Sequence, residues 1–191
     1  MSLLTDLIAV RSNPPDPFGT DKDTTHCYGP VYTELFAPIR DTARSVLEIG
    51  VFSGAFTEVL VNYFPHAEVH AVDITLQDVR YAKDILYRTV RFYEADGTDP
   101  ALPAKIGKTF DVIIEDASHK PDDQVATLAH FAPYLNAGGI YVIEDIPGEN
   151  LPALAPRLEA VAAANGLAME VRDLRSVKHR FDDVLAIFTK P

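Results

Sequence analysis

Residues 45–54, Ser-Val-Leu-Glu-Ile-Gly-Val-Phe-Ser-Gly, constrain the fold of this chain more than any other stretch. A short apolar run containing Glu48 leads to two glycines, Gly50 and Gly54, and then to an amphipathic pattern that Ser53 is placed to cap. This order predicts a strand, a tight turn and a helix. Glycine lets backbone N–H groups approach a ligand without an intervening Cβ, so the turn suits a nucleotide-sized ligand. A purely structural turn is the alternative, because one Gly-rich turn is weak evidence.

Two further acids stand where the next strands are expected to end. The apolar run 68–73 closes with Asp73, and a carboxylate at that place can accept both hydroxyls of a ribose. The run 89–94 is followed by Asp96 and Gly97. Asp96 has two interpretations: it accepts the exocyclic amine of an adenine, or it is simply good turn chemistry before a glycine.

The rest of the chain alternates between strand and helix patterns. Regular alternation predicts an α/β fold with a doubly wound, seven-stranded, mostly parallel sheet that has helices on both faces. A chain of 191 residues most simply forms one compact domain. The expected strands are 45–49, 68–73, 89–94, 110–116, 138–143, 167–174 and 183–189, and the expected helices are 3–10, 31–39, 55–60, 76–87, 99–107, 122–135 and 151–165.

Residues 1–40 are expected to form an N-terminal helix and lid segment before the ligand-binding domain, 41–191. Leu3, Leu4, Leu7 and Ile8 share one face of the first helix, which predicts packing on the domain or on a second subunit of a homo-oligomer. The polar stretch 19–30 then offers Lys22, His26 and Tyr28 among small residues. It is either a solvated loop or a lid that carries side chains over the ligand.

Charge and composition exclude several classes of partner. The formal net charge is −11 and no basic patch stands out, so nucleic acid is not expected as a partner. The single cysteine, Cys27, rules out an internal disulfide framework and fits a reducing compartment. No apolar run is long enough to span a bilayer, and the first residues lack the pattern of a signal peptide. We therefore expect a cytoplasmic protein that has no membrane partner.

Many polar residues fall at the expected carboxyl ends of the strands, where parallel sheets bind their ligands. So many acids at one edge repel each other unless a cation, a ligand or protonation offsets their charge. The residues at this edge are Glu48, Asp73, Asp96, Asp116, Ser118, His119, Glu144 and Asp145.

Asp116, Glu144 and Asp145 together offer the oxygen ligands that a hard cation such as Mg²⁺ prefers. His119 follows Asp116 by three residues, so it can reach a substrate group at such a metal and act as a general base. A helix-cap or surface histidine is the alternative interpretation of His119.

At this point a family resemblance can be stated. The stretch from Glu48 to Gly54 resembles the first motif of class I S-adenosylmethionine-dependent methyltransferases, with Asp73 and Asp96 at the ribose and adenine positions of that family. Three further stretches are similar to bacterial metal-dependent sugar O-methyltransferases of the mycinamicin and macrocin type. They are Gly19-Thr-Asp-Lys22, Glu115-Asp-Ala-Ser-His119 and Gly138-Gly-Ile-Tyr-Val-Ile-Glu144-Asp145.

The resemblance implies a Rossmann-like methyltransferase fold and transfer of a methyl group to a hydroxyl of a small molecule, such as a sugar or a natural-product intermediate. It implies S-adenosylmethionine as cofactor, Mg²⁺ held by Asp116, Glu144 and Asp145, and His119 as the base. The implied cofactor-binding residues are Lys22, Glu48, Gly50, Gly54, Asp73, Asp96, Gly97 and Asp116.

Three other functions stay open on the sequence alone. A nicotinamide dehydrogenase usually has three glycines as G-x-G-x-x-G, whereas Glu48 and Phe52 stand in the corresponding stretch here. A noncatalytic S-adenosylmethionine-binding module has no need to assemble the acids and histidine at the strand ends. A metal-independent methyltransferase needs only the cofactor-binding residues and no metal ligands.

Overall fold

The computed structural model describes residues 2–12, 16–81 and 90–191, and it confirms the predicted seven-stranded, mostly parallel sheet. The strand order is β3-β2-β1-β4-β5-β7-β6, and β7 runs antiparallel to both of its neighbours. The order reverses direction between β1 and β4, where ligands of such sheets bind. The strands are β1 Ser45–Ile49, β2 Glu68–Asp73, β3 Val90–Glu94, β4 Phe110–Glu115, β5 Leu135–Ile143, β6 Ala168–Asp173 and β7 Val184–Thr189.

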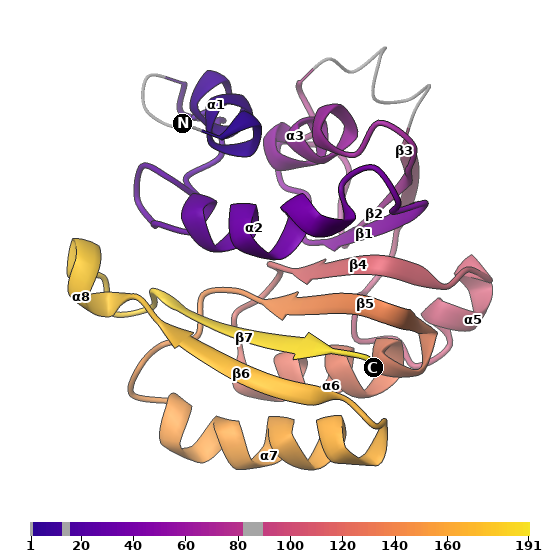
Figure 1. Ribbon diagram of the computed structural model, residues 1–191. Coiled ribbons are helices and arrows are strands. Elements are labelled where there is room, and N and C mark those ends of the chain that lie inside the picture. Colours follow the sequence, from indigo (N-terminus) through magenta and orange to yellow (C-terminus); the bar gives the residue numbers. More distant parts are fainter. Residues whose placement is uncertain (1, 13–15, 82–89) are drawn as a thin grey trace.

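Helices cover both faces of the sheet, as predicted (Figure 1). The helices α1 Leu3–Val10, α2 Gly29–Phe36 and α3 Ala55–Tyr63 lie on one face. The opposite face carries α5 Leu102–Ile106, α6 Pro121–Phe131 and α7 Leu151–Ala164. Short 3₁₀ helices extend α2 over Ala37–Ile39 and α6 over Ala132–Tyr134, and a single turn, α8 Arg175–Lys178, joins β6 to β7.

The apolar runs form strands because side chains alternate between two buried layers. Val46 and Val112 pack with the core under α1 to α3, whereas Leu47 and Ile113 pack with the core under α5 to α7. A central parallel strand that is buried on both faces is mostly apolar, and the buried charged residues of β1 and β4, Glu48 and Glu115, lie near the carboxyl ends. The cores therefore fix β1 and β4 at the middle of the sheet, and their carboxyl ends lie side by side.

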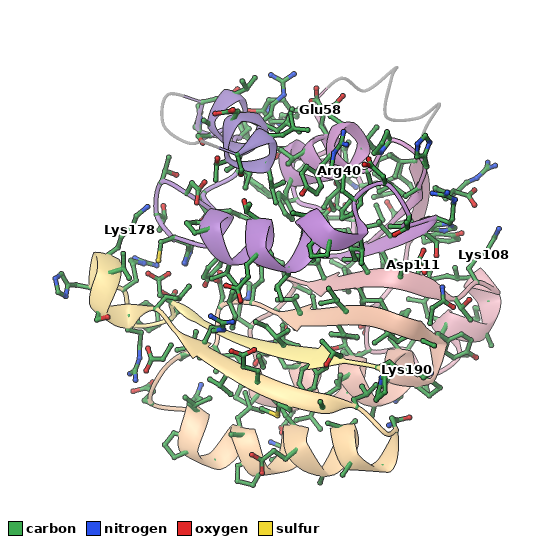
Figure 2. All side chains as sticks on the ribbon, in the orientation of Figure 1. Arg40, Glu58, Lys108, Asp111, Lys178 and Lys190 are labelled. Carbon is green, nitrogen blue, oxygen red and sulfur yellow. The ribbon has the colours of Figure 1, made fainter. Side chains whose placement is uncertain are left out.

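The N-terminal helix packs on the domain itself, which is one of its two expected positions. Leu4 and Ile8 are fully buried, and the Arg11 guanidinium donates to both oxygens of Glu58. Glu58 lies on α3 (Figure 2). The structure corrects the expected apolar face at one residue. Leu3 is 47% exposed, because it lies outside the strip that contacts the core.

Three local expectations need correction. Gly54, in the left-handed conformation, is the N-cap residue of α3, and the Ser53 hydroxyl donates instead to the carbonyl oxygen of Phe18 at 2.5 Å. β5 begins at Leu135 because that residue pairs with Phe110, so the two glycines lie inside the strand. Residues 76–81 are not helical, and 82–87 of the helix expected over 76–87 lie outside the described residues, as do 13–15 and residue 89.

Across the described ranges, no helix has both the length and the apolar character needed to cross a bilayer.

Candidate functional site

A cavity of about 710 Å³ opens where the strand order reverses, a size within the usual range for small-molecule sites. Its walls come from the N-terminal segment, the Gly-rich turn and the carboxyl ends of the five parallel strands β1 to β5. Nine of the predicted site residues line it, whereas Gly54 and Glu144 do not. The nine are Lys22, Glu48, Gly50, Asp73, Asp96, Gly97, Asp116, His119 and Asp145.

The Gly-rich turn needs glycine at Gly50 for two reasons. Its φ is 96°, and a Cβ there would lie 2.1 Å from the carbonyl oxygen of Asp116. Asp73 Oδ2 holds the turn by accepting the backbone N–H groups of Val51 at 2.7 Å and Phe52 at 3.0 Å. Asp73 Oδ1 accepts the N–H of Thr75 at 3.1 Å, which leaves this oxygen capacity for another donor.

Asp96 makes the local turn and also lines the cavity. Its Oδ1 accepts the N–H and the hydroxyl of Thr98 at 2.8 and 2.7 Å, and these hydrogen bonds lower the pKa of Asp96. A Cβ at Gly97 would approach the Ile49 side chain to 2.7 Å, so the chain passes close to β1 here. The two interpretations of Asp96 are therefore compatible.

Glu48 lies beneath the turn and is almost completely buried. Its Oε2 accepts the Thr57 hydroxyl at 2.5 Å. Burial raises the pKa of Glu48 to about 8, since water no longer stabilises the carboxylate.

Asp116, His119 and Asp145 come together at the ends of β4 and β5. Each offers one ligand atom, and these three atoms lie within 4.8 Å of one another. The His119 Nδ1 atom is 4.0 Å from Asp116 Oδ1, and its Nε2 atom is 3.9 Å from Asp145 Oδ2. Among the described residues, His119 Nδ1 has no hydrogen-bond partner.

The backbone at this group is strained. His119 and Asp145 have φ values of 57° and 52°, in the left-handed region that residues other than glycine rarely adopt. Such strain persists where the surrounding structure imposes it, and it is often found at functional sites. The two strained residues lie on opposite sides of one small space, which makes that space a candidate site.

Glu144 does not join this group, although it precedes Asp145 directly. It is buried, and its Oε2 accepts from Lys22 Nζ at 2.5 Å while its Oε1 accepts from the Tyr32 hydroxyl. Lys22 Nζ also donates to Asp116 Oδ2 at 2.7 Å. Burial alone would lower the pKa of Lys22, but the Asp116 and Glu144 carboxylates raise it well above its usual value, so the ammonium stays charged.

The segment that carries Lys22 supplies further partners of the acids. The Tyr28 hydroxyl donates to Asp145 Oδ1 at 2.5 Å, and burial together with Asp145 raises the pKa of Tyr28, which keeps the proton on the hydroxyl. His26 is buried beside Asp21, Asp145 and Asp183. Burial opposes its charge, but these acids raise the pKa of His26 to about 9.

Lys22, His26 and Tyr28 are therefore already packed against the acids in this structure. The lid function of 19–30 stays a prediction, and slower hydrogen exchange on ligand addition would support it.

Sequence reasoning missed Tyr32 and Gln124 as partners of Glu144. The amide of Gln124 donates to the Glu144 carbonyl oxygen at 3.0 Å. Tyr32 follows Tyr28 by four residues, and this helical spacing places both side chains on one face. That spacing was the available signal for Tyr32, whereas nothing in the sequence marked Gln124.

Comparisons with known proteins place the chain in a family. A family model described as a methyltransferase domain matches residues 47–146, more than half of the chain. The 8-demethyl-8-alpha-L-rhamnosyl tetracenomycin-C 2'-O-methyltransferase of Streptomyces olivaceus is 35% identical over 146 residues, 71% of this chain and 37% of that protein. The mycinamicin VI 2''-O-methyltransferase of Micromonospora griseorubida is 28% identical over 131 residues, 63% of this chain and 32% of that protein.

Among solved structures, the MycE methyltransferase from the mycinamycin biosynthetic pathway, in complex with Mg and SAH, has the same fold. Its TM-score is 0.74 at 20% identity, with 99% of this chain and 55% of that chain covered. The chain thus spans about a third of the length of the two curated relatives and about half of this structure. From the match over 47–146, this chain belongs to the methyltransferase-domain family.

Proposed function

We propose that this chain is an S-adenosylmethionine-dependent, Mg²⁺-dependent O-methyltransferase that acts on a hydroxyl of a small molecule, a sugar or a natural-product intermediate. The observation that carries the proposal is the convergence of Asp116, His119 and Asp145 at a cavity that the Gly-rich turn also lines. The names of the relatives support the reaction class and the type of acceptor, and the Mg and SAH in the MycE title support the two cofactors.

The residues around the turn suit S-adenosylmethionine. Gly50 lets the backbone approach the ligand, Gly54 starts α3 directly after the turn, and Asp73 retains acceptor capacity for the ribose hydroxyls. Asp96 and Gly97, which we assign to the adenine, line the same cavity as Glu48, Lys22 and Asp116. The cavity is large enough for the whole cofactor and part of an acceptor.

The acidic group suits a hard divalent cation. Asp116 and Asp145 would hold Mg²⁺, since both present carboxylate oxygens to one space that is partly exposed. Glu144 is the proposed third ligand, and it can bind the ion only when Lys22 or Tyr32 gives up one of its oxygens. When bound, Mg²⁺ supplies a Lewis acid that lowers the pKa of an acceptor hydroxyl.

The protein residues then orient the acceptor and take its proton. His119 is 40% exposed at the cavity, and its Nε2 atom, 3.9 Å from Asp145 Oδ2, is the ring nitrogen that we expect to accept a proton from the hydroxyl, since Nδ1 is buried. Lys22 balances the charge of Asp116 and keeps that carboxylate in place. Transfer of the methyl group is a displacement, so correct positioning of the acceptor oxygen supplies much of the rate.

Calorimetric titration with S-adenosylmethionine and with NAD, with and without Mg²⁺, tests the proposal. We expect S-adenosylmethionine to bind and Asp73→Ala to lose about 1.5–3 kcal/mol of affinity for each charge-assisted hydrogen bond removed. A panel of sugar and other hydroxylated acceptors would then be screened for release of S-adenosylhomocysteine with Mg²⁺ or EDTA. Binding of NAD alone would refute the proposal, and full turnover in EDTA would refute its metal part.

A further inference from the structure

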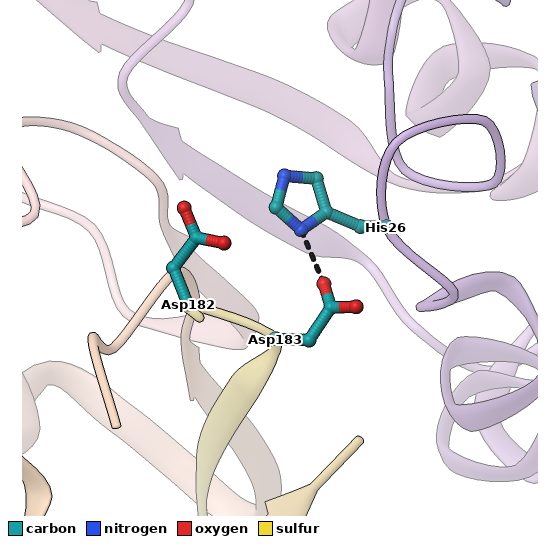
Figure 3. A group of neighbouring side chains, drawn as sticks. All are labelled: His26, Asp182 and Asp183. Carbon is teal, nitrogen blue, oxygen red and sulfur yellow. Dashed lines mark hydrogen bonds and ion pairs between the residues drawn. The ribbon is translucent and has the colours of Figure 1, made fainter. Parts of the chain in front are cut away.

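His26 and Asp183 form a buried pair that the proposed mechanism does not use. The His26 Nδ1 atom lies 2.5 Å from Asp183 Oδ1, and Asp183 is completely buried between the N-terminal segment and the start of β7 (Figure 3). Burying two ionisable groups costs desolvation free energy. We therefore ask whether the pair stabilises the fold or orients a neighbouring site. Their neighbours suggest which of these applies.

The pair is connected to Asp145 through Tyr28. The His26 ring stacks on the Tyr28 ring with centroids 4.8 Å apart, and the Tyr28 hydroxyl donates to Asp145 Oδ1. His26 Nδ1 is itself 3.6 Å from the same oxygen. Both contacts fall on Oδ1, whereas Oδ2 is the oxygen that faces His119 at 3.9 Å.

Lys178, on the single turn α8 between β6 and β7, fixes the backbone around His26. Lys178 Nζ on α8 donates to the carbonyl oxygens of Asp23 at 2.5 Å and Thr24 at 2.9 Å, and also to that of His26 (Figure 2). The backbone on the His26 side of the pair is therefore anchored. His26 has little freedom to turn away from Asp183 or from Tyr28.

We propose that Tyr28 and the His26–Asp183 pair are positioning residues for Asp145. They hold its Oδ1 atom, so that its Oδ2 atom points into the space shared with Asp116 and His119. This inference rests on the proposed function, because it explains the strained conformation of Asp145 by the binding of a cation. Partners that orient a metal ligand typically change metal affinity by about 10–100-fold when they are removed.

A rival interpretation uses the same side chains as a second cation site. His26, Asp182 and Asp183 offer ligand atoms within 4.8 Å of one another, and one oxygen of each aspartate is buried without a partner among the described residues. The 2.5 Å contact between His26 and Asp183, however, is a hydrogen bond, which leaves no room for an ion between these two atoms. We therefore favour the positioning function.

The test measures Mn²⁺ affinity of the full chain by electron paramagnetic resonance, with S-adenosylhomocysteine affinity and urea unfolding recorded in parallel. Tyr28→Phe and Asp183→Asn are each expected to weaken Mn²⁺ binding about 10–100-fold and to change cofactor affinity less than about twofold. Tyr141→Phe is the matched control: Tyr141 is equally buried, it lies on β5 just before Asp145, and its hydroxyl has no partner among the described residues. It should leave Mn²⁺ affinity unchanged.

Unchanged Mn²⁺ affinity in folded Tyr28→Phe and Asp183→Asn would overturn the positioning function and leave the proposed function intact. An equal loss in Tyr141→Phe would also overturn it, since the effect would then be a general consequence of altering a buried tyrosine. Two bound Mn²⁺ ions, one of them lost in Asp183→Asn, would establish the rival site instead. Failure of the wild-type chain to bind Mn²⁺ at all would refute the metal part of the proposed function, and this inference with it.

Discussion

Lys22 Nζ lies 2.5 Å from Glu144 Oε2, and both side chains are buried. The same ammonium lies 4.6 Å from the centre of the Phe56 ring, which adds a cation–π contact. Lys22 therefore supplies the positive charge that lets Asp116 and Glu144 sit side by side when the protein holds no metal ion. Lys22 thus links the N-terminal segment to Asp116 and Glu144, as Tyr28 links it to Asp145.

We predict that Lys22→Met destabilises the metal-free protein by about 3–5 kcal/mol, because removing one partner leaves a buried carboxylate without compensation. Urea unfolding in EDTA measures this change. Lys105→Met is the control, since Lys105 Nζ pairs with Asp99 Oδ2 at 2.9 Å at an exposed position. An exposed pair contributes about 0–1 kcal/mol, so equal losses in the two variants would contradict the prediction.

Gly50 and Gly138 provide a matched test of the Gly-rich turn. Both have positive φ values, 96° and 74°, but a Cβ at Gly50 would lie 2.1 Å from a backbone oxygen, whereas a Cβ at Gly138 meets nothing within 4 Å. Gly138→Ala should cost about 1–2 kcal/mol through its conformation alone. We expect Gly50→Ala to be clearly more destabilising in urea unfolding and to abolish cofactor binding. Similar losses in both variants would mean that the close approach to Asp116 is not important.

The sequence was a good guide to the part of the site that lies on the parallel strands. Asp116 and Asp145 meet because β4 and β5 pair in parallel, so their carboxyl ends reach the same edge. Glu144 could not be placed in the same way. Both residues follow the last residue of β5, Ile143, where the strand pattern no longer specifies side-chain direction: Glu144 turns toward Tyr32, while Asp145 reaches the cavity from a left-handed backbone.

The N-terminal contribution was harder to predict, for a different reason. Lys22 and Asp116 are 94 residues apart, and Tyr28 and Asp145 are 117 apart. Only the folded chain brings such pairs together, since no local pattern specifies them. Composition left the segment 19–30 evenly divided between a solvated loop and a lid, and burial of its Lys22, His26 and Tyr28 excludes a fully solvated loop.

Glu48 should make the stability of the protein depend on pH. Its pKa of about 8 in the folded chain exceeds the ordinary value of 4.5, so the folded state binds more protons than the unfolded state between these two values. Stability should therefore fall as pH rises from about 4.5 to 8, with a slope of at most about 1.4 kcal/mol per pH unit from this group.

Urea unfolding of the metal-free protein across this pH range tests the effect of Glu48. In Glu48→Gln the loss of stability with rising pH should be smaller, because the amide cannot ionise. Glu149→Gln is the control, since Glu149 is exposed and its curve should run parallel to that of the wild type. A Glu48→Gln curve that is also parallel to the wild type would show that Glu48 does not titrate in this range.

His119 is the residue on which the proposed chemistry depends most directly. Once an acceptor is identified, His119→Ala should lower kcat by about 10²–10⁴-fold, because no other described side chain replaces the proton acceptor at this position. Cofactor affinity should stay nearly intact, since His119 makes no hydrogen bond to Asp73 or to the Gly-rich turn among the described residues. Ser118→Ala is the control, because the Ser118 hydroxyl lines the same cavity but is bound to Asp123 Oδ2 at 2.6 Å.

The same variant also separates the two chemical functions that His119 can have. If His119 is the base, His119→Ala should bind Mn²⁺ as tightly as the wild type and lose only turnover. If His119 is instead a metal ligand together with Asp116 and Asp145, Mn²⁺ affinity should fall along with turnover. Normal turnover in His119→Ala would refute both functions and leave its strained conformation, φ 57°, without a catalytic explanation.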